Sequence, residues 1–128
     1  MPVTLKSHDN NNTILVYNFE GQWSWSEFIM VDDKVWNTFE QTDERTDLIF
    51  DLTHSTHIPM GVGNIMHRVG RRTDSAKKGL CIIVNPPNIT SLILGTLRRL
   101  YPLTVQIYRT VSTFEDAIQL IETDRNFK

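Results

Sequence analysis

The stretch DLIFDLTHSTHIPMGVGNIM, residues 47–66, changes its pattern twice. The run TDLIFDL over 46–52 is almost continuously apolar, which is typical of a central strand that is covered on both faces of a sheet. Apolar residues then recur at i, i+3, i+4 and i+7 from Val62, the spacing of one buried helix face. Between these parts lie two histidines, a proline and two glycines, which indicate a turn. The stretch therefore predicts a strand, a turn and a helix.

The rest of the chain repeats this alternation of strands and helices. We predict strands at 2–6, 13–21, 46–52, 79–85 and 103–110, and helices at 24–42, 61–72, 88–101 and 112–123. Capping boxes of Ser24 with Glu27 and of Ser112 with Glu115 indicate where the first and last helices begin. Such an order implies right-handed crossovers. We therefore expect a single α/β domain over 1–128, with a mixed, mostly parallel central sheet of 4–5 strands and about four helices.

Composition limits the class of protein. The chain has 128 residues, of which 40% are hydrophobic and 22% charged, as expected of a soluble globular domain. We find no apolar run of the roughly 20 residues that span a bilayer, and the first residues lack the apolar stretch of a secretion signal. Because Cys81 is the single cysteine, no disulfide can form within the chain. These features predict a cytoplasmic location without membrane insertion.

Charge is distributed unevenly along the sequence. Residues 1–60 carry ten acidic and three basic side chains, and residues 61–128 carry five acidic and ten basic ones. Residues 61–109 hold eight basic groups against one aspartate, so this part predicts either a positive face for an anionic ligand or a solvated helix surface. The three tryptophans, Trp23, Trp25 and Trp36, belong to the acidic half. They are not interleaved with the basic residues, and we therefore expect no nucleic-acid partner.

The order and spacing of these elements resemble the STAS domain, the fold of anti-sigma factor antagonists and of the cytoplasmic tails of sulphate transporters. Residues 47–66 are similar to the family's strand, turn and helix signature, and residues 79–101 and 107–121 resemble its later elements. Gly61 and Gly63 match the family's two glycines if the turn is one residue shorter. The positions that match directly are Asp51, Leu52, Thr53 and Ile58.

This resemblance implies a non-enzymatic regulatory or scaffold module that binds another protein, such as a kinase-like anti-sigma factor or a homodimer mate. In regulatory family members, a serine at the helix start accepts a phosphate from the partner kinase. Here Pro59 and Met60 occupy that place, and neither can be phosphorylated. The nearest hydroxyl groups, on Thr53, Ser55 and Thr56, lie earlier in the turn. We therefore predict a divergent member that is not switched by serine phosphorylation at the usual site.

The candidate binding site follows the strand at 46–52, because ligands of such sheets gather outside the carboxyl ends of the strands. The helix start at Gly61 offers free N–H groups to an anion, with basic side chains one turn further on. This favours, as an alternative function, a sensor of a small ligand, an anion or a lipid; a merely structural turn also remains open. The predicted ligand-binding or partner-binding residues are Asp51, His54, His57, Met60, Gly61, Gly63, Asn64, His67, Arg68 and Arg71.

Signs of catalysis are weak. His54 and His57 lack the further ligands that a metal site needs, so we predict no metal. We find no nucleophile elbow, Walker loop or dinucleotide fingerprint, and we predict no cofactor. An enzyme using Asp51 and His57 as acid and base remains the third alternative. Asp32 interrupts the apolar stripe of its helix, which favours a boundary residue on the helix flank over an acid in a cleft.

Overall fold

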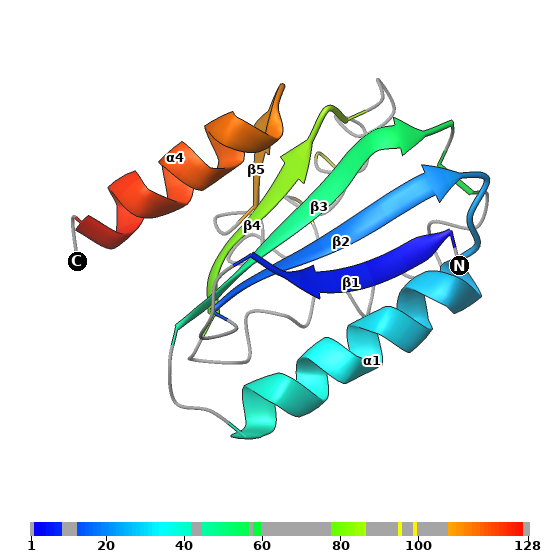
Figure 1. Cartoon of the computed structure of the whole chain (residues 1–128), viewed down its shortest axis with the longest axis horizontal. Coiled ribbons are helices and arrows are strands. Elements are labelled where there is room, and N and C mark those ends of the chain that lie inside the picture. Colours follow the sequence, from blue (N-terminus) through cyan, green and yellow to red (C-terminus); the bar gives the residue numbers. More distant parts are fainter. Residues whose placement is uncertain are drawn as a thin grey trace.

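The computed structural model of the chain describes residues 2–8, 13–41, 45–56, 58–59, 78–86, 95, 99 and 108–126. These residues form one five-stranded sheet of order β1-β2-β3-β4-β5, in which β1 is antiparallel to β2 and the other pairs are parallel (Figure 1). The α/β class and the mixed, mostly parallel sheet are thus confirmed. The elements are β1 (Val3–Ser7), β2 (Ile14–Gly21), α1 (Trp25–Gln41), β3 (Thr46–Ser55), β4 (Lys78–Val84), β5 (Tyr108–Val111) and α4 (Phe114–Asn126).

Two helices are bounded within the described residues, fewer than the four or so expected. The helix predicted at 61–72 lies outside the described residues. So does most of the one at 88–101, of which Gly95 and Arg99 are described and are helical.

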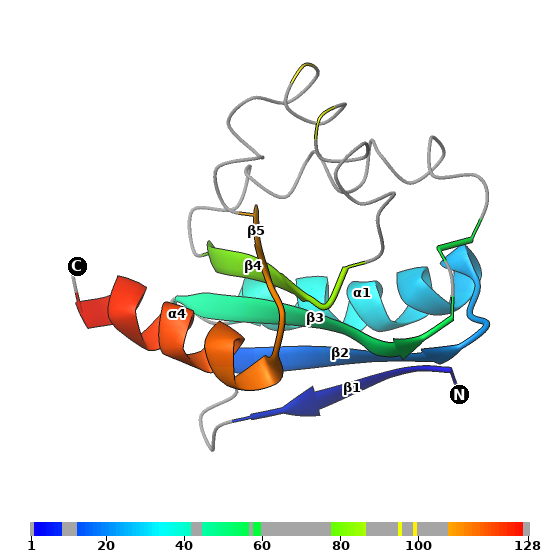
Figure 2. The same cartoon turned by 90° about the horizontal axis from the view of Figure 1, so that it is seen from above.

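Both faces of the sheet are covered by a helix, and α1 and α4 lie on opposite sides (Figure 2). Alternation along each strand directs successive side chains to the two faces. In β3, Leu48 and Phe50 join the core under α1, whereas Ile49 joins the core under α4. The nearly continuous apolar run at 46–52 is explained by this burial on both sides.

The ends of the helices test the predicted capping boxes. The first is confirmed: Ser24 Oγ accepts the Glu27 amide at 3.2 Å, and Glu27 Oε1 accepts the Ser24 amide at 3.1 Å. The second is wrong by one residue, because Thr113 Oγ1 accepts the amide of Asp116 at 3.2 Å. Strand β5 continues to Val111, so the helix begins later than the box of Ser112 and Glu115 predicts.

A buried carboxylate joins the amino-terminal ends of the strands to α4. Asp47 has no exposed surface, and its carboxylate accepts the amide of Leu80 in β4 at 2.7 Å. Arg45 Nη2 lies 2.9 Å from Asp47 Oδ1, and Arg125 Nε donates to Asp47 Oδ2 at 2.8 Å. Arg45 also pairs with Asp124 at 2.7 Å. We call Arg45, Asp47, Asp124 and Arg125 the Asp47 cluster.

Burial disfavours the charged form of Arg45, but the hydrogen bonds and charges of Asp47 and Asp124 outweigh it, and the pKa of the guanidinium is raised above its ordinary value. Arg125 also donates to the carbonyl of Thr13 at 3.0 Å, just before β2. The Asp47 cluster therefore fixes the starts of β2 and β3 against the last turn of α4.

A register shift beside Asp47 explains why Gly79 stands in β4. Thr46 pairs with Lys78 but Leu48 pairs with Cys81, so β4 holds one extra residue. The Asp47 carboxylate accepts the amide of Leu80 within this bulge. A Cβ atom on Gly79 would overlap Asp47 Oδ1 and the guanidinium of Arg45.

We therefore expect Gly79→Ala to lower the free energy of unfolding by about 2–3 kcal/mol, because the added methyl group displaces a fully buried charged group. Urea denaturation followed by circular dichroism measures the change. The control is Gly95→Ala, since a Cβ atom on this exposed helical glycine meets nothing within 4 Å. That substitution should raise stability by up to about 1 kcal/mol. Equal effects of the two alanines would contradict the steric account.

Candidate functional site

The carboxyl end of β3 forms the candidate site together with the turn that follows β2. Strand β3 continues to Ser55, so Asp51 and His54 belong to the strand, and His54 does not lie in a turn as predicted. The neighbouring strand β2 ends at Gly21, whose φ of 57° lies in the left-handed region that glycine adopts without strain. We call residues 20–25 and the described residues of 51–59 the rim.

A second register shift sets the direction of the side chains at the rim. Asn18 pairs with Asp51 but Glu20 pairs with His54, so β3 holds an extra residue between these pairs. The shift turns His54 to the face of Glu20, which is the α4 side of the sheet, and leaves Ser55 beside Gly21. Simple alternation would have placed His54 with Leu52 in the core under α1.

Asp51 orders the strand end. Its Oδ1 accepts the amide of Thr53 at 3.0 Å, and the carboxylate is half-buried. Because Thr53 still belongs to β3, this contact orders the last residues of the strand. The side chains of Thr53 and His54 are exposed, as is that of Glu20 on the adjacent strand.

Two tryptophans brace the rim from the side of α1. The indole of Trp23 is buried, and its Nε1 donates to Ser55 Oγ at 2.9 Å. The Trp25 indole donates to the carbonyl oxygen of Pro59 at 3.2 Å. The two rings meet edge to face with centroids 5.0 Å apart. Residues 23–25 thus hold both Ser55, the last residue of β3, and Pro59 beyond it.

Further contacts add to this brace. The amide of Thr56 donates to the carbonyl oxygen of Gly21 at 3.1 Å, which continues the pairing of β2 and β3 past the strand ends. Ile58 packs against the core under α1. Backbone, indole and apolar contacts together give the rim a defined conformation, while the Thr56 side chain stays exposed.

The tryptophans were not among the predicted site residues, because their place in the acidic half was weighed only against binding of nucleic acid. A usable signal is present in the sequence: two indoles flank a helix cap directly after the glycine that ends a strand. Indole N–H groups need an acceptor when they are buried. The expectation for Asp32 was wrong: this carboxylate is fully buried and accepts the hydroxyl of Tyr17 at 2.6 Å.

Several predicted site residues cannot be compared with the structure. Among the residues that it describes, no three side chains of His, Cys, Asp or Glu come together as a metal site. Cys81 is buried in β4, as its place in an apolar run predicts. The following predicted residues lie outside the described part of the chain: His57, Met60, Gly61, Gly63, Asn64, His67, Arg68 and Arg71.

Comparison with protein-family models and with curated proteins finds no match to this chain. Within the part of the chain that the structure covers, no helix has both the length and the apolar character needed to cross a membrane.

The hydroxyl of Ser55 should be needed to hold the rim. Ser55→Ala leaves the buried Trp23 N–H without this acceptor, so we expect the free energy of unfolding to fall by about 1–2 kcal/mol. Amide exchange at Thr56, measured by NMR, should accelerate because its bond to Gly21 lies next to the lost contact. The matched control is Ser26→Ala on the exposed side of α1, which should cause no loss. Unchanged exchange at Thr56 in the Ser55 variant would argue against the brace.

Proposed function

We propose that this chain is a protein-binding regulatory or scaffold module of the STAS type, non-enzymatic and cytoplasmic, which recognises its partner through the rim. The further helices predicted at 61–72 and 88–101 belong to this proposed fold. The mixed sheet with its antiparallel β1 and the helix between β2 and β3 have the order expected of such a module.

The observation that carries this function is the pair of indole hydrogen bonds to Ser55 and Pro59. They hold Ser55 at the end of β3 and Pro59 beyond it, at the carboxyl ends of parallel strands, where ligands of such sheets gather. A pre-ordered segment loses little conformational entropy when a partner binds. Thr53, His54 and Thr56 of the rim present their side chains to solvent.

A second candidate, a sensor of an anionic small ligand or lipid, rests on the charge of the sequence. Residues 61–109 carry eight basic side chains against one acidic. Thermal-shift screening with phosphates, nucleotides and fatty acids tests it. A ligand at 100 times its dissociation constant should stabilise the protein by about 2.7 kcal/mol, and a panel without any shift would remove this candidate.

The protein-binding function is tested with the substitution Thr56→Glu. The backbone bond of Thr56 to Gly21 does not involve the side chain, so the fold should persist while the rim gains a charge. A partner that wild-type protein captures from cell extract is purified and its affinity measured by titration calorimetry. We expect Thr56→Glu to weaken this affinity at least roughly tenfold, as substitution at the centre of an interface does.

The matched control is Thr123→Glu, which makes the same change on exposed α4. It should bind as the wild type does, and the partner should leave the complex with unchanged mass. Equal loss of affinity in both variants, or a chemically altered partner, would contradict recognition by the rim or a non-enzymatic role.

A further inference from the structure

Among the residues that the structure describes, β1 is an end strand of the sheet, and no strand pairs with its outer side. The amide of Glu20 donates to Pro2 O at 2.7 Å, and the amide of His8 donates to Ile14 O at 2.9 Å. Hydrogen-bonded pairs alternate along an antiparallel ladder. Thr4 and Lys6 therefore direct their backbone groups to β2, whereas those of Val3 and Leu5 point away from the sheet. Because β1 is an end strand of the sheet, these groups can pair with a further strand.

Helix α1 adds an apolar surface beside this edge, which we call the floor. In Figure 1 the helix projects past β1, and Figure 2 places it behind the sheet. Leu5, Ile29 and Trp36 are partly buried and pack on the core beneath β1. Met30, on the outer part of α1, is 56% exposed. A strand added to β1 would lie over this floor and could bury its apolar side chains there.

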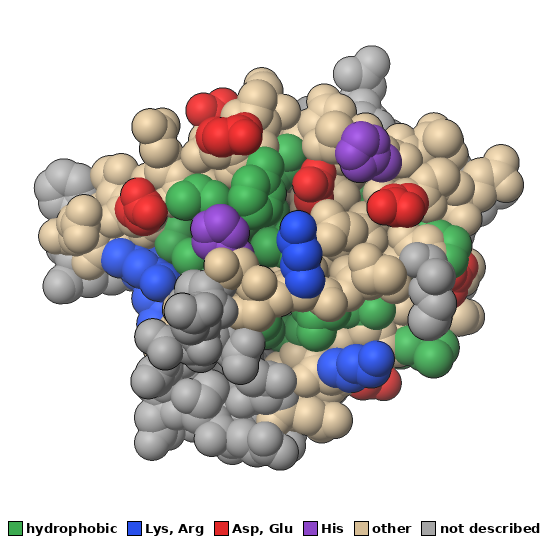
Figure 3. All heavy atoms as spheres, viewed as in Figure 1, with side chains coloured by type: hydrophobic (Ala, Val, Ile, Leu, Met, Phe, Trp, Pro, Cys, Tyr) green, Lys and Arg blue, Asp and Glu red, His purple; other side chains and the backbone are tan. Residues whose placement is uncertain are grey.

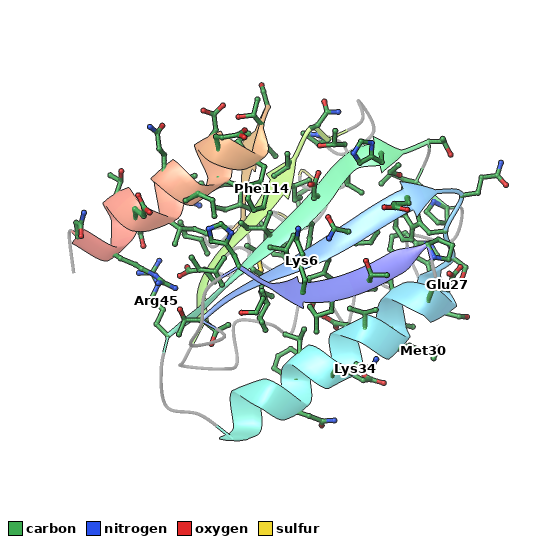
Figure 4. All side chains as sticks on the ribbon, in the orientation of Figure 1. Lys6, Glu27, Met30, Lys34, Arg45 and Phe114 are labelled. Atoms are coloured by element: carbon green, nitrogen blue, oxygen red, sulfur yellow. The ribbon has the colours of Figure 1, made fainter. Side chains whose placement is uncertain are left out.

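Lysines lie on both sides of the apolar surface, and the exposed Asp33 stands next to Lys34 on α1. Lys6 stands on β1 in front of the sheet, and Lys34 stands on α1 (Figure 4). Figure 3 shows hydrophobic side chains between these two lysines on the face seen in Figure 1. The two faces of an added strand therefore meet different surroundings: one face meets Lys6, and the other meets the apolar side chains of α1 together with the adjacent Asp33 and Lys34.

We propose that β1 and α1 form a docking groove for an extended acidic segment of a partner protein, which adds to the sheet as an antiparallel strand with alternating apolar and acidic residues. The backbone groups of Val3 and Leu5 bind its main chain, the floor of α1 takes the apolar side chains, and Lys6 faces the acidic ones. Antiparallel pairing is favoured because its hydrogen bonds are better aligned. This groove is separate from the rim.

A second copy of the chain fits this edge less well. Pairing of β1 with its symmetry mate would bring the projecting α1 of each copy toward the other on the same face of the joined sheet. A register with Leu5 opposite the Leu5 of the mate would also place the two Lys6 side chains on the same face, two residues apart. A single extended segment meets neither obstacle.

The test uses a fluorescein-labelled peptide of about seven residues in which isoleucine and glutamate alternate, titrated with the full chain by fluorescence anisotropy. Residues opposite Leu5 point their N–H groups at β1 in an antiparallel strand, and the isoleucines occupy these places. N-methylation of the isoleucines should therefore weaken binding roughly tenfold or more. N-methylation of the glutamates, whose N–H groups point outward, should change the dissociation constant less than about twofold.

Charge reversal locates the peptide on the protein. Lys6→Glu should weaken binding roughly threefold to tenfold, and its melting temperature should stay near that of the wild type because Lys6 is exposed. Arg109→Glu makes a similar change on β5 at the opposite edge and should leave binding unchanged. The proposal is overturned by absent binding, by equal effects of both methylation patterns, by equal effects of both charge reversals, or by a wild-type dimer that Lys6→Glu dissociates in analytical ultracentrifugation.

Discussion

The placement of the strands and of α4 depends on one buried carboxylate. Asp47 lies near the amino-terminal end of β3, the middle strand of the sheet, without contact to solvent, where an unpaired charge would be strongly destabilising. Donors from three parts of the chain compensate it: Arg45 before β3, Leu80 in β4 and Arg125 near the end of α4. Because these donors are far apart in sequence, the charge is satisfied only when the sheet and the last helix are both in place.

The two ends of the parallel strands differ in how their polar groups are satisfied. At the amino-terminal ends of the parallel strands, polar groups face inward and bind one another. At the carboxyl ends, the tryptophans satisfy their own N–H groups on Ser55 and on Pro59, while the neighbouring threonine and histidine side chains face solvent. A bulge accompanies each arrangement, beside Asp47 at one end and before His54 at the other. The amino-terminal ends of the parallel strands are thus held together by buried polar contacts, whereas the carboxyl ends expose side chains to solvent.

The sequence predicts the α/β class and the order of the described elements well because apolar alternation and capping act over a few residues. The prediction fails where contacts with residues distant in sequence determine the structure. Thr53 to Ser55 extend β3 because of the pairing with Glu20 and Gly21 from another strand, and this pairing leaves no local pattern. Asp32 was expected at a boundary because of its charge, yet it is buried against Tyr17 from β2. The Asp51 contact, by contrast, spans two residues and was open to prediction.

The candidate site follows the same rule. Its location after the central strand comes from topology, which the order of elements already implies. The indole hydrogen bonds come from Trp23 and Trp25 at the start of α1. From sequence alone, these two residues are equally compatible with simple packing in the hydrophobic core.

Gly79 and the Asp47 cluster also bear on how the sequence can diverge. The carboxylate occupies the volume that any larger side chain at position 79 would need. Loss of the acid would in turn leave two guanidinium groups facing each other without their shared counter-ion. A single change at either site is therefore expected to destabilise the fold, and sequences that depart from this arrangement should differ at several of these positions jointly. Coevolution of these positions is the signature by which homologous chains with the same internal architecture could be identified.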